Sequence, residues 1–191
     1  MDNRERIMQQ AEELFYSKGY DAAGVQEIVD RAGVTKPTLY YYFGSKRGLL
    51  QALLEEKFRR LRPQMGAAIG EPEGIREKLY RMAGIYYRFF VEEYKFYMLL
   101  MALFYSAHEN EAYQTVKPYL TDFYQAVVRV FEKASDELGN MNGRQRQFAI
   151  TFIGSLSQYL VLSHDGETGE NTVSEEQVYE LVNQFMHGIF S

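Results

Sequence analysis

The residues best suited to chemistry lie in one short stretch, RAGVTKPTLYYYFGSKRGLL, near the amino end. Three consecutive tyrosines, Tyr40, Tyr41 and Tyr42, stand between two lysines, Lys36 and Lys46. Phenolic hydroxyls donate hydrogen bonds to phosphate oxygens, and ammonium groups neutralise phosphate charge. These residue types in this pattern favour contact with a polyanion such as a nucleic acid.

A tight turn must position these side chains. Apolar residues at helical spacing predict a short helix over residues 25–32. Gly33 can take the left-handed conformation that ends this helix. Thr35 can cap the next helix, over residues 35–43, through its hydroxyl, and Pro37 fits its first turn because an N–H there has no helical partner. The sequence therefore predicts a helix-turn-helix whose second helix exposes its amino end.

The rest of the chain also favours helices, because apolar residues recur at helical spacing and only four prolines occur. We expect an all-α protein with a small helical head on a larger helical body. Pro63 and the GAAIGEPEG stretch that follows it predict a break between the two. The first helix is expected to end at Gly19, and further helices are expected at about 45–61, 75–93, 96–107, 111–138, 143–164 and 174–190.

Composition narrows the classes of function. The absence of Cys excludes structural disulfides, cysteine-bound metals and thiol chemistry, and it fits a cytoplasmic protein. The charged amphipathic start does not resemble a secretory signal, and the longest apolar run, FYMLLMALFY, is too short to cross a bilayer. Net charge is −5, with 11 Lys/Arg against 9 Asp/Glu up to Arg62 and a surplus of acid beyond it. Nucleic-acid binding must therefore rest on local placement of charge.

Catalysis has no support in the sequence. The three histidines, His108, His164 and His187, are isolated, and no nucleophile motif, P-loop or dinucleotide fingerprint occurs. Asp165 and Glu167 could chelate a cation together with His164, but a solvated loop is the better interpretation of that stretch. We expect no enzyme activity, no cofactor and no metal site.

The stretch GYDAAGVQEIVDRAGVTKPTLYYYFGSKRGLL, residues 19–50, resembles the DNA-binding domain of the TetR family of bacterial transcriptional regulators. The resemblance rests on the glycine–valine turn, the T-L-Y recognition helix, the aromatic–Phe pair and the S-K that follows. It covers about a quarter of the chain, and the remainder matches only as a helical body of the expected length. It implies a homodimer whose recognition helices enter successive major grooves of a palindromic operator, with a ligand pocket in each body.

The resemblance also implies specific contacts with double-stranded DNA. Ala23 and Gly24 stand where the family's second helix usually opens with Ser or Thr, so we expect no side-chain phosphate contact there. Tyr42 either packs inside or contacts phosphate, because neighbouring helical side chains point about 100° apart. The expected DNA contacts are Gln26, Thr35, Lys36, Pro37, Thr38, Tyr40, Tyr41, Tyr42 and Lys46.

The body, over residues 47–191, is expected to bind a ligand and to dimerise, whereas residues 1–46 form the DNA-binding domain and the helix over residues 45–61 connects them. The whole chain holds 13 Phe and 16 Tyr, and those of the body belong either to the core or to an apolar cavity for a small hydrophobic or aromatic effector. The residues expected to line such a cavity are Tyr86, Phe90, Tyr97, Met101, Tyr105, Tyr124, Phe152 and Tyr159.

The last two predicted helices carry wide apolar faces, and Gly154 allows close helix approach. These faces belong either to the core of one chain or to a dimer interface, which the resemblance implies. The sequence predicts a ligand-responsive transcriptional regulator, a repressor acting as a homodimer and touching no membrane. The alternative is a small-molecule-binding or interaction module with a degenerate DNA-binding head. The expected interface residues are Phe148, Phe152, Leu156, Val178, Leu181 and Phe185.

Overall fold

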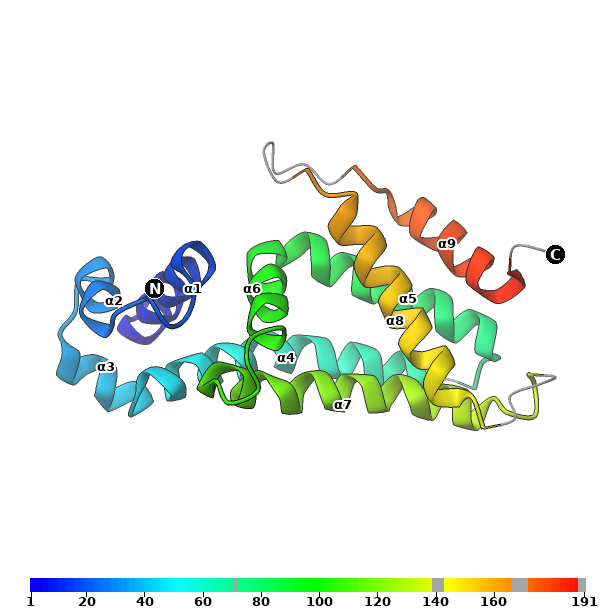
Figure 1. Cartoon of the computed structure of the whole chain (residues 1–191), viewed down its shortest axis with the longest axis horizontal. Coiled ribbons are helices and arrows are strands. Elements are labelled where there is room, and N and C mark those ends of the chain that lie inside the picture. The colour runs from blue at the N-terminus through cyan, green and yellow to red at the C-terminus, as the bar shows by residue number, and fades with distance from the viewer. Residues whose placement is uncertain (71, 139–142, 166–171, 189–191) are drawn as a thin grey trace. The chain divides into compact units, whose positions relative to one another are not determined.

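Helices make up all the regular structure that the computed structural model describes, which covers residues 1–70, 72–138, 143–165 and 172–188 (Figure 1). The predicted all-α fold is confirmed over these residues. No helix among them is both long enough and apolar enough to cross a bilayer. The helices in chain order are α1 (Asn3–Lys18), α2 (Val25–Ala32), α3 (Lys36–Phe43), α4 (Lys46–Gly70), α5 (Ile75–Glu92), α6 (Tyr94–Phe104), α7 (Glu111–Lys133), α8 (Gln145–Leu162) and α9 (Glu175–His187).

The helices form two compact units, each built from two stretches of chain. The first unit comprises Met1–Arg60 and Glu93–Leu120, and the second comprises Leu61–Glu92 and Thr121–Ser191. The division predicted from the sequence, at residue 46, concerns the functions of the two parts and stays a prediction.

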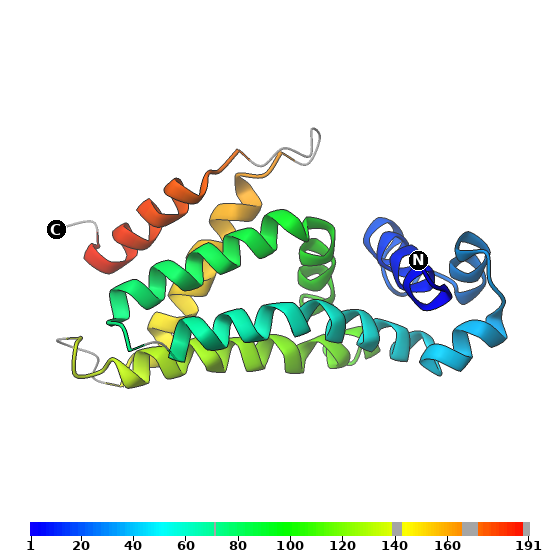
Figure 2. The same ribbon diagram turned by 180° about the vertical axis from the view of Figure 1, so that it is seen from behind.

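The core of the first unit is built around α1. Asp2 accepts a hydrogen bond from the Glu5 N–H at 2.8 Å, and the Glu5 side chain accepts one from the Asp2 N–H at 2.9 Å. This capping box fixes where the helix begins. Ile7, Leu14 and Phe15 are buried on its apolar face, and α1 contacts α2, α3 and α6. The head helices α1–α3 are drawn in blue in Figures 1 and 2.

The second unit packs α5 against α8 and α9, which also contact each other (Figure 2). A Cβ atom at Gly84 of α5 would lie 2.8 Å from both Glu175 Oε1 and Tyr179 Oη of α9. Both atoms are ends of side chains, so a larger residue at position 84 would require Glu175 and Tyr179 to shift. Around the second unit's core, four phenylalanine rings lie within ring-contact distance of one another, those of Phe131, Phe148, Phe152 and Phe185.

One predicted helix end is wrong. The sequence predicted that the fourth helix stops near residue 61, but α4 continues through Pro63 to Gly70. Pro63 is exposed, so water can reach the carbonyl that loses its amide partner, and a proline is tolerated there. Two other ends shift by a few residues: the helix over 96–107 is Tyr94–Phe104, and the helix over 111–138 ends at Lys133. Residues 189 and 190, the predicted end of the last helix, lie outside the described residues.

Candidate DNA-binding surface

The predicted turn lies between α2 and α3. Gly33 has φ 64°, in the left-handed region, and its N–H donates to the Asp30 carbonyl at 3.2 Å. The Val34 N–H donates to the Val29 carbonyl at 3.0 Å. These bonds satisfy the last carbonyls of α2 and turn the chain into α3. The predicted helix-turn-helix is therefore present, with α2 and α3 joined at Gly33.

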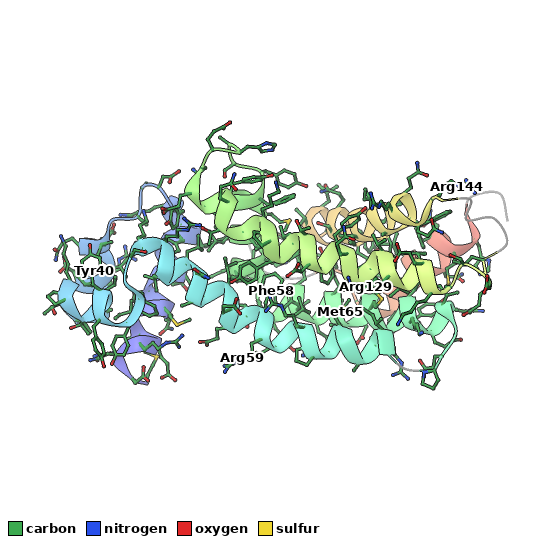
Figure 3. All side chains as sticks on the ribbon, turned by 90° about the horizontal axis from the view of Figure 1, so that it is seen from below. Tyr40, Phe58, Arg59, Met65, Arg129 and Arg144 are labelled. Atoms are coloured by element: carbon green, nitrogen blue, oxygen red, sulfur yellow. The ribbon has the colours of Figure 1, made fainter. Side chains whose placement is uncertain are left out.

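One side of α3 is buried and the other is exposed. Leu39 has no exposed surface and anchors the helix in the head. Tyr40, Tyr41 and Tyr42 are 47%, 83% and 40% exposed. Lys36, near the amino end, is exposed as well. The aromatic and basic side chains therefore share the solvent side of a helix that the core holds in place (Figure 3, where Tyr40 is labelled).

The sequence left two possibilities for the Tyr42 side chain, packing inside the head or contact with a phosphate. Its ring lies 5.2 Å from the Tyr41 ring and 6.0 Å from the Phe43 ring, centroid to centroid. The residue is 40% exposed, and its ring packs against those of its own helix neighbours. Its contact with DNA stays a prediction.

Thr35 does not cap α3 through its side chain, contrary to the expectation from the sequence. Its Oγ1 lies 2.9 Å from Thr38 Oγ1, so the two hydroxyls hydrogen-bond each other. Pro37 explains part of this difference, because a capping hydroxyl bonds the second or third N–H of a helix and the second residue here is a proline. Gln26 is also engaged within its helix, since its Nε2 donates to Asp30 Oδ1 at 2.7 Å.

Lys46, at the start of α4, points inward. Its Nζ donates to the Asp21 carbonyl oxygen at 3.3 Å and lies 4.4 Å from the centroid of the Tyr20 ring. Burial lowers the pKa of Lys46, and the negative charges of Asp21 and Glu111 act in the opposite direction. The lysine expected to meet a phosphate is therefore held by a cation–π contact and a carbonyl in this structure.

The residues that hold Lys46 were not found from the sequence. Tyr20 donates its hydroxyl to Glu111 Oε1 at 2.7 Å, and burial together with this hydrogen bond raises the pKa of Tyr20. Asn110 Nδ2 donates to Asp21 Oδ2 at 2.7 Å. Tyr20 and Asp21 follow Gly19 in the motif and could have been suspected, whereas Asn110 and Glu111 lie about ninety residues further along and carry no such signal.

Glu27 of α2 engages two nearby cations. Its Oε1 lies 2.6 Å from Lys18 Nζ and 3.2 Å from Arg31 Nη2. The hydrogen bond from Lys18 is the main cause that lowers the pKa of Glu27. The charges of Lys18 and Arg31 are therefore partly neutralised, whereas Lys36 and Arg47 are exposed.

The residues expected to line an effector cavity lie in both units, and their role stays a prediction. In the first unit Tyr97 is 2% exposed, Met101 is half-buried and Tyr105 is 75% exposed, so Tyr105 lies on the surface. The second unit holds Tyr86, Phe90 and Phe152, which are buried, and Tyr124 and Tyr159, which are half-buried.

The residues expected at a dimer interface are mostly turned into the second unit. Phe152, Leu156 and Val178 are buried within it, while Phe148, Leu181 and Phe185 are half-buried. The apolar side chains that α8 exposes are Ile150 and Leu162, at 60% and 81% exposed. Neither residue was among those expected at the dimer interface from the sequence.

In the described residues, no three His, Asp or Glu side chains are placed to hold a metal ion. Glu167, one of the three residues considered for a cation, lies outside the described residues.

Comparison with known proteins identifies the head. Residues 7–53 match the family model of the bacterial regulatory proteins of the tetR family. Over these residues the chain is similar to the DNA-binding domain of the TetR family. It is 33% identical over 99 residues to the HTH-type transcriptional activator FasR of Mycolicibacterium smegmatis. These residues make up 52% of this chain and 45% of FasR. The chain therefore matches less than half the length of that relative.

Solved structures agree over nearly the whole fold. A Clostridium perfringens protein described as a fatty acid metabolism regulator has a TM-score of 0.84 at 18% identity, over 97% of this chain and 99% of its own. The transcriptional regulator FadR from Bacillus subtilis, solved in complex with stearoyl-CoA, has a TM-score of 0.80 at 19% identity, over 97% and 98%. At such identities the likeness concerns the fold alone.

Proposed function

We propose that this chain is a ligand-responsive transcriptional repressor of the TetR family that binds a palindromic operator as a homodimer in the cytoplasm. The observation that carries the proposal is α3: Leu39 is fully buried, while three tyrosines and Lys36 lie on its solvent side beside a glycine turn. A helix held in this way presents side chains to the major groove, and tyrosine hydroxyls and lysine position it on the phosphates.

We propose that different side chains contact the bases and the phosphates of the DNA. Thr38 and Pro37, at the amino end of α3, are placed for base edges and thymine methyl groups, because recognition helices read bases with that end. Tyr40, Tyr41 and Lys46 are assigned to phosphates. Repression follows if a dimer covering the operator blocks access of other proteins to that DNA.

Selection of bound fragments from a random double-stranded DNA pool tests the DNA-binding proposal. We expect an enriched palindrome whose half-sites lie about one helical turn, roughly 34 Å, apart. A promoter reporter carrying that palindrome should be more active without the protein than with it. Enrichment of no sequence, with only weak and salt-sensitive binding to all DNA, would instead favour the module with a degenerate head.

The effector is proposed to be an apolar molecule, and a long-chain acyl-CoA is the first compound to test. FadR shares this fold and was solved with stearoyl-CoA. Buried aromatic and aliphatic side chains of the second unit, among them Phe90, Phe152 and Leu160, offer the apolar surroundings that an acyl chain needs.

Operator affinity measured with and without stearoyl-CoA tests the effector proposal. Coupling between two sites typically changes affinity by about 5-fold to 150-fold. We expect a change in this range with stearoyl-CoA and none with CoA alone. A detergent with the same acyl chain but no CoA serves as the control for nonspecific denaturation, and an equal effect of that detergent would contradict the proposal.

A further inference from the structure

The first unit contains a pocket of about 520 Å³ that none of the expected cavity residues lines. One wall comes from the end of α1 and the residues after it, and the other comes from α6. Its volume falls within the range of small-molecule sites, which is about 300–1,000 Å³. The walls include Phe15, Tyr16, Tyr20, Met98, Leu99 and Leu103.

The walls are mainly aromatic and aliphatic. Phe15, Leu99 and Leu103 are almost fully shielded from solvent, whereas Tyr16 is 39% exposed at the edge. Ala102 of α6 also lines the pocket and is exposed. The pocket therefore offers a flat apolar molecule stacking contacts inside and a route to solvent.

Polar side chains also line this pocket. Asp21, Ser106 and Asn110 line it, as does Lys18. The Lys18 ammonium is engaged by Glu27 at 2.6 Å. The Asp21 side chain is exposed, and its Oδ2 accepts a hydrogen bond from the neutral Asn110 amide at 2.7 Å. Because Lys18 is already paired with Glu27, the Asp21 carboxylate is the charged lining group that we assign as the anchor for a ligand.

We infer that this pocket is a binding site for a small aromatic amine. The aromatic body packs between Tyr16 and the α6 side chains Met98 and Ala102, and the protonated amine pairs with the Asp21 carboxylate. The Lys46 ammonium bonds the Asp21 carbonyl oxygen at 3.3 Å and is also attracted by the negative charge of Asp21, so the ligand amine competes with Lys46 for this charge. This site lies in the same unit as the helix-turn-helix and is separate from the effector site proposed above.

Three indoles that differ in charge test the inference. Tryptamine is cationic, 3-ethylindole is neutral and indole-3-acetate is anionic. Because the chain contains no Trp, indole fluorescence reports the probe without a protein tryptophan background. We expect saturable binding in the order tryptamine, 3-ethylindole, indole-3-acetate. The titration uses the full chain without DNA, so its failure is distinct from failure of the DNA-binding proposal.

Variants locate the binding. Ala102→Phe fills the pocket and should abolish saturable binding of tryptamine, while Ala67→Phe, at an exposed alanine of α4, should bind as the wild type does. Ala22→Phe, from the opposite wall, is the second filling variant if the first does not fold. Asp21→Asn should weaken tryptamine about fivefold, as for a partly exposed ion pair, and leave 3-ethylindole unchanged.

Other outcomes of these titrations would contradict the inference. Tryptamine binding that survives both filling variants, or no saturable binding to the wild type, would overturn the site. Tighter binding of indole-3-acetate than of tryptamine would overturn the assignment of Asp21 as the anchor.

Discussion

Lys46 is the residue at which the structure changes the expected chemistry most. Its ammonium lies over the Tyr20 ring, and Tyr20 is in turn bonded to Glu111. A phosphate must compete with the ring and with the Asp21 carbonyl for this cation. A charge-assisted bond to phosphate is stronger than a cation–π contact at a partly exposed site, so the lysine can move out when DNA is present.

Removal of Lys46 tests whether it reaches DNA. We expect Lys46→Ala to weaken binding to all DNA sequences by a similar factor, because phosphate contacts carry no sequence information. The slope of log affinity against log salt should fall by about one unit for each protomer bound. Binding isotherms at several salt concentrations measure it, with Lys133→Ala, an exposed lysine of α7, as the control. Equal slopes for wild type and Lys46→Ala would assign the lysine to the fold of the head alone.

Tyr41 gives the second prediction at this scale, because its 83% exposure leaves it little part in the core. Tyr41→Ala should lower operator affinity about tenfold, the value of a hydrogen bond to a charged group, with an unchanged melting temperature. Tyr105→Ala is the matched control, since Tyr105 is 75% exposed outside the head. Affinity is measured by fluorescence anisotropy without effector. Equal affinity of the Tyr41 variant and the wild type would remove this tyrosine from the contact surface.

At the scale of the element, the start of α4 depends on a single glycine. The Gly48 N–H donates to Ser45 Oγ at 2.9 Å, so Ser45 caps the helix. A Cβ atom at Gly48 would lie 2.0 Å from the Phe43 carbonyl oxygen, which is a backbone atom and cannot rotate away. Because α3 ends at Phe43, this close approach sets how α4 follows the recognition helix.

A pair of glycine substitutions in α4 tests this requirement. Gly48→Ala should destabilise the protein by about 1–3 kcal/mol, as overpacking does. Gly66→Ala, where a Cβ meets nothing within 4 Å, should stabilise it by about 0.5–1 kcal/mol, because alanine favours the helix. Chemical denaturation gives both values. A stabilising Gly48→Ala would show that the α3–α4 junction relaxes without cost.

At the scale of the whole molecule, the proposed homodimer needs an apolar surface that the chain itself leaves exposed. On α8 this surface includes Ile150 and Leu162, and a Cβ at Gly154 between them would meet nothing within 4 Å. A helix with a glycine in such a place can approach a second helix closely. The proposed twofold interface is therefore centred on Gly154, with the buried Phe152 and Leu156 supporting it from behind.

Gly154→Arg should convert the dimer to a monomer. The side chain would project to the surface, so the helical content of each chain should be retained while close approach of a partner is blocked. Gly66→Arg, also at a helical glycine with open space, should leave the oligomeric state unchanged. Sedimentation or light scattering at several concentrations measures the mass. A Gly154→Arg protein that keeps the mass of the wild type would place the interface elsewhere.

The sequence by itself determined the helical class and the glycine turn, and it predicted Tyr40 and Tyr41 on the exposed side of α3, because these features depend on local spacing and on residues within one turn of each other. Gly33 shows this, since its backbone preference indicated the end of α2 without help from the rest of the chain. The run of α4 through Pro63 could not be read in the same way, because helix breaking depends on whether the freed carbonyl is solvated.

Only the tertiary structure decided what surrounds Lys46 and which aromatic side chains are buried. The bonds of Tyr20 to Glu111 and of Asp21 to Asn110 join residues about ninety positions apart, so no local pattern contains them. The same holds for Tyr105 and Phe90, which look alike in a helical sequence but are 75% and 0% exposed. Burial depends on which helices pack against a residue, and that is a property of the assembled chain.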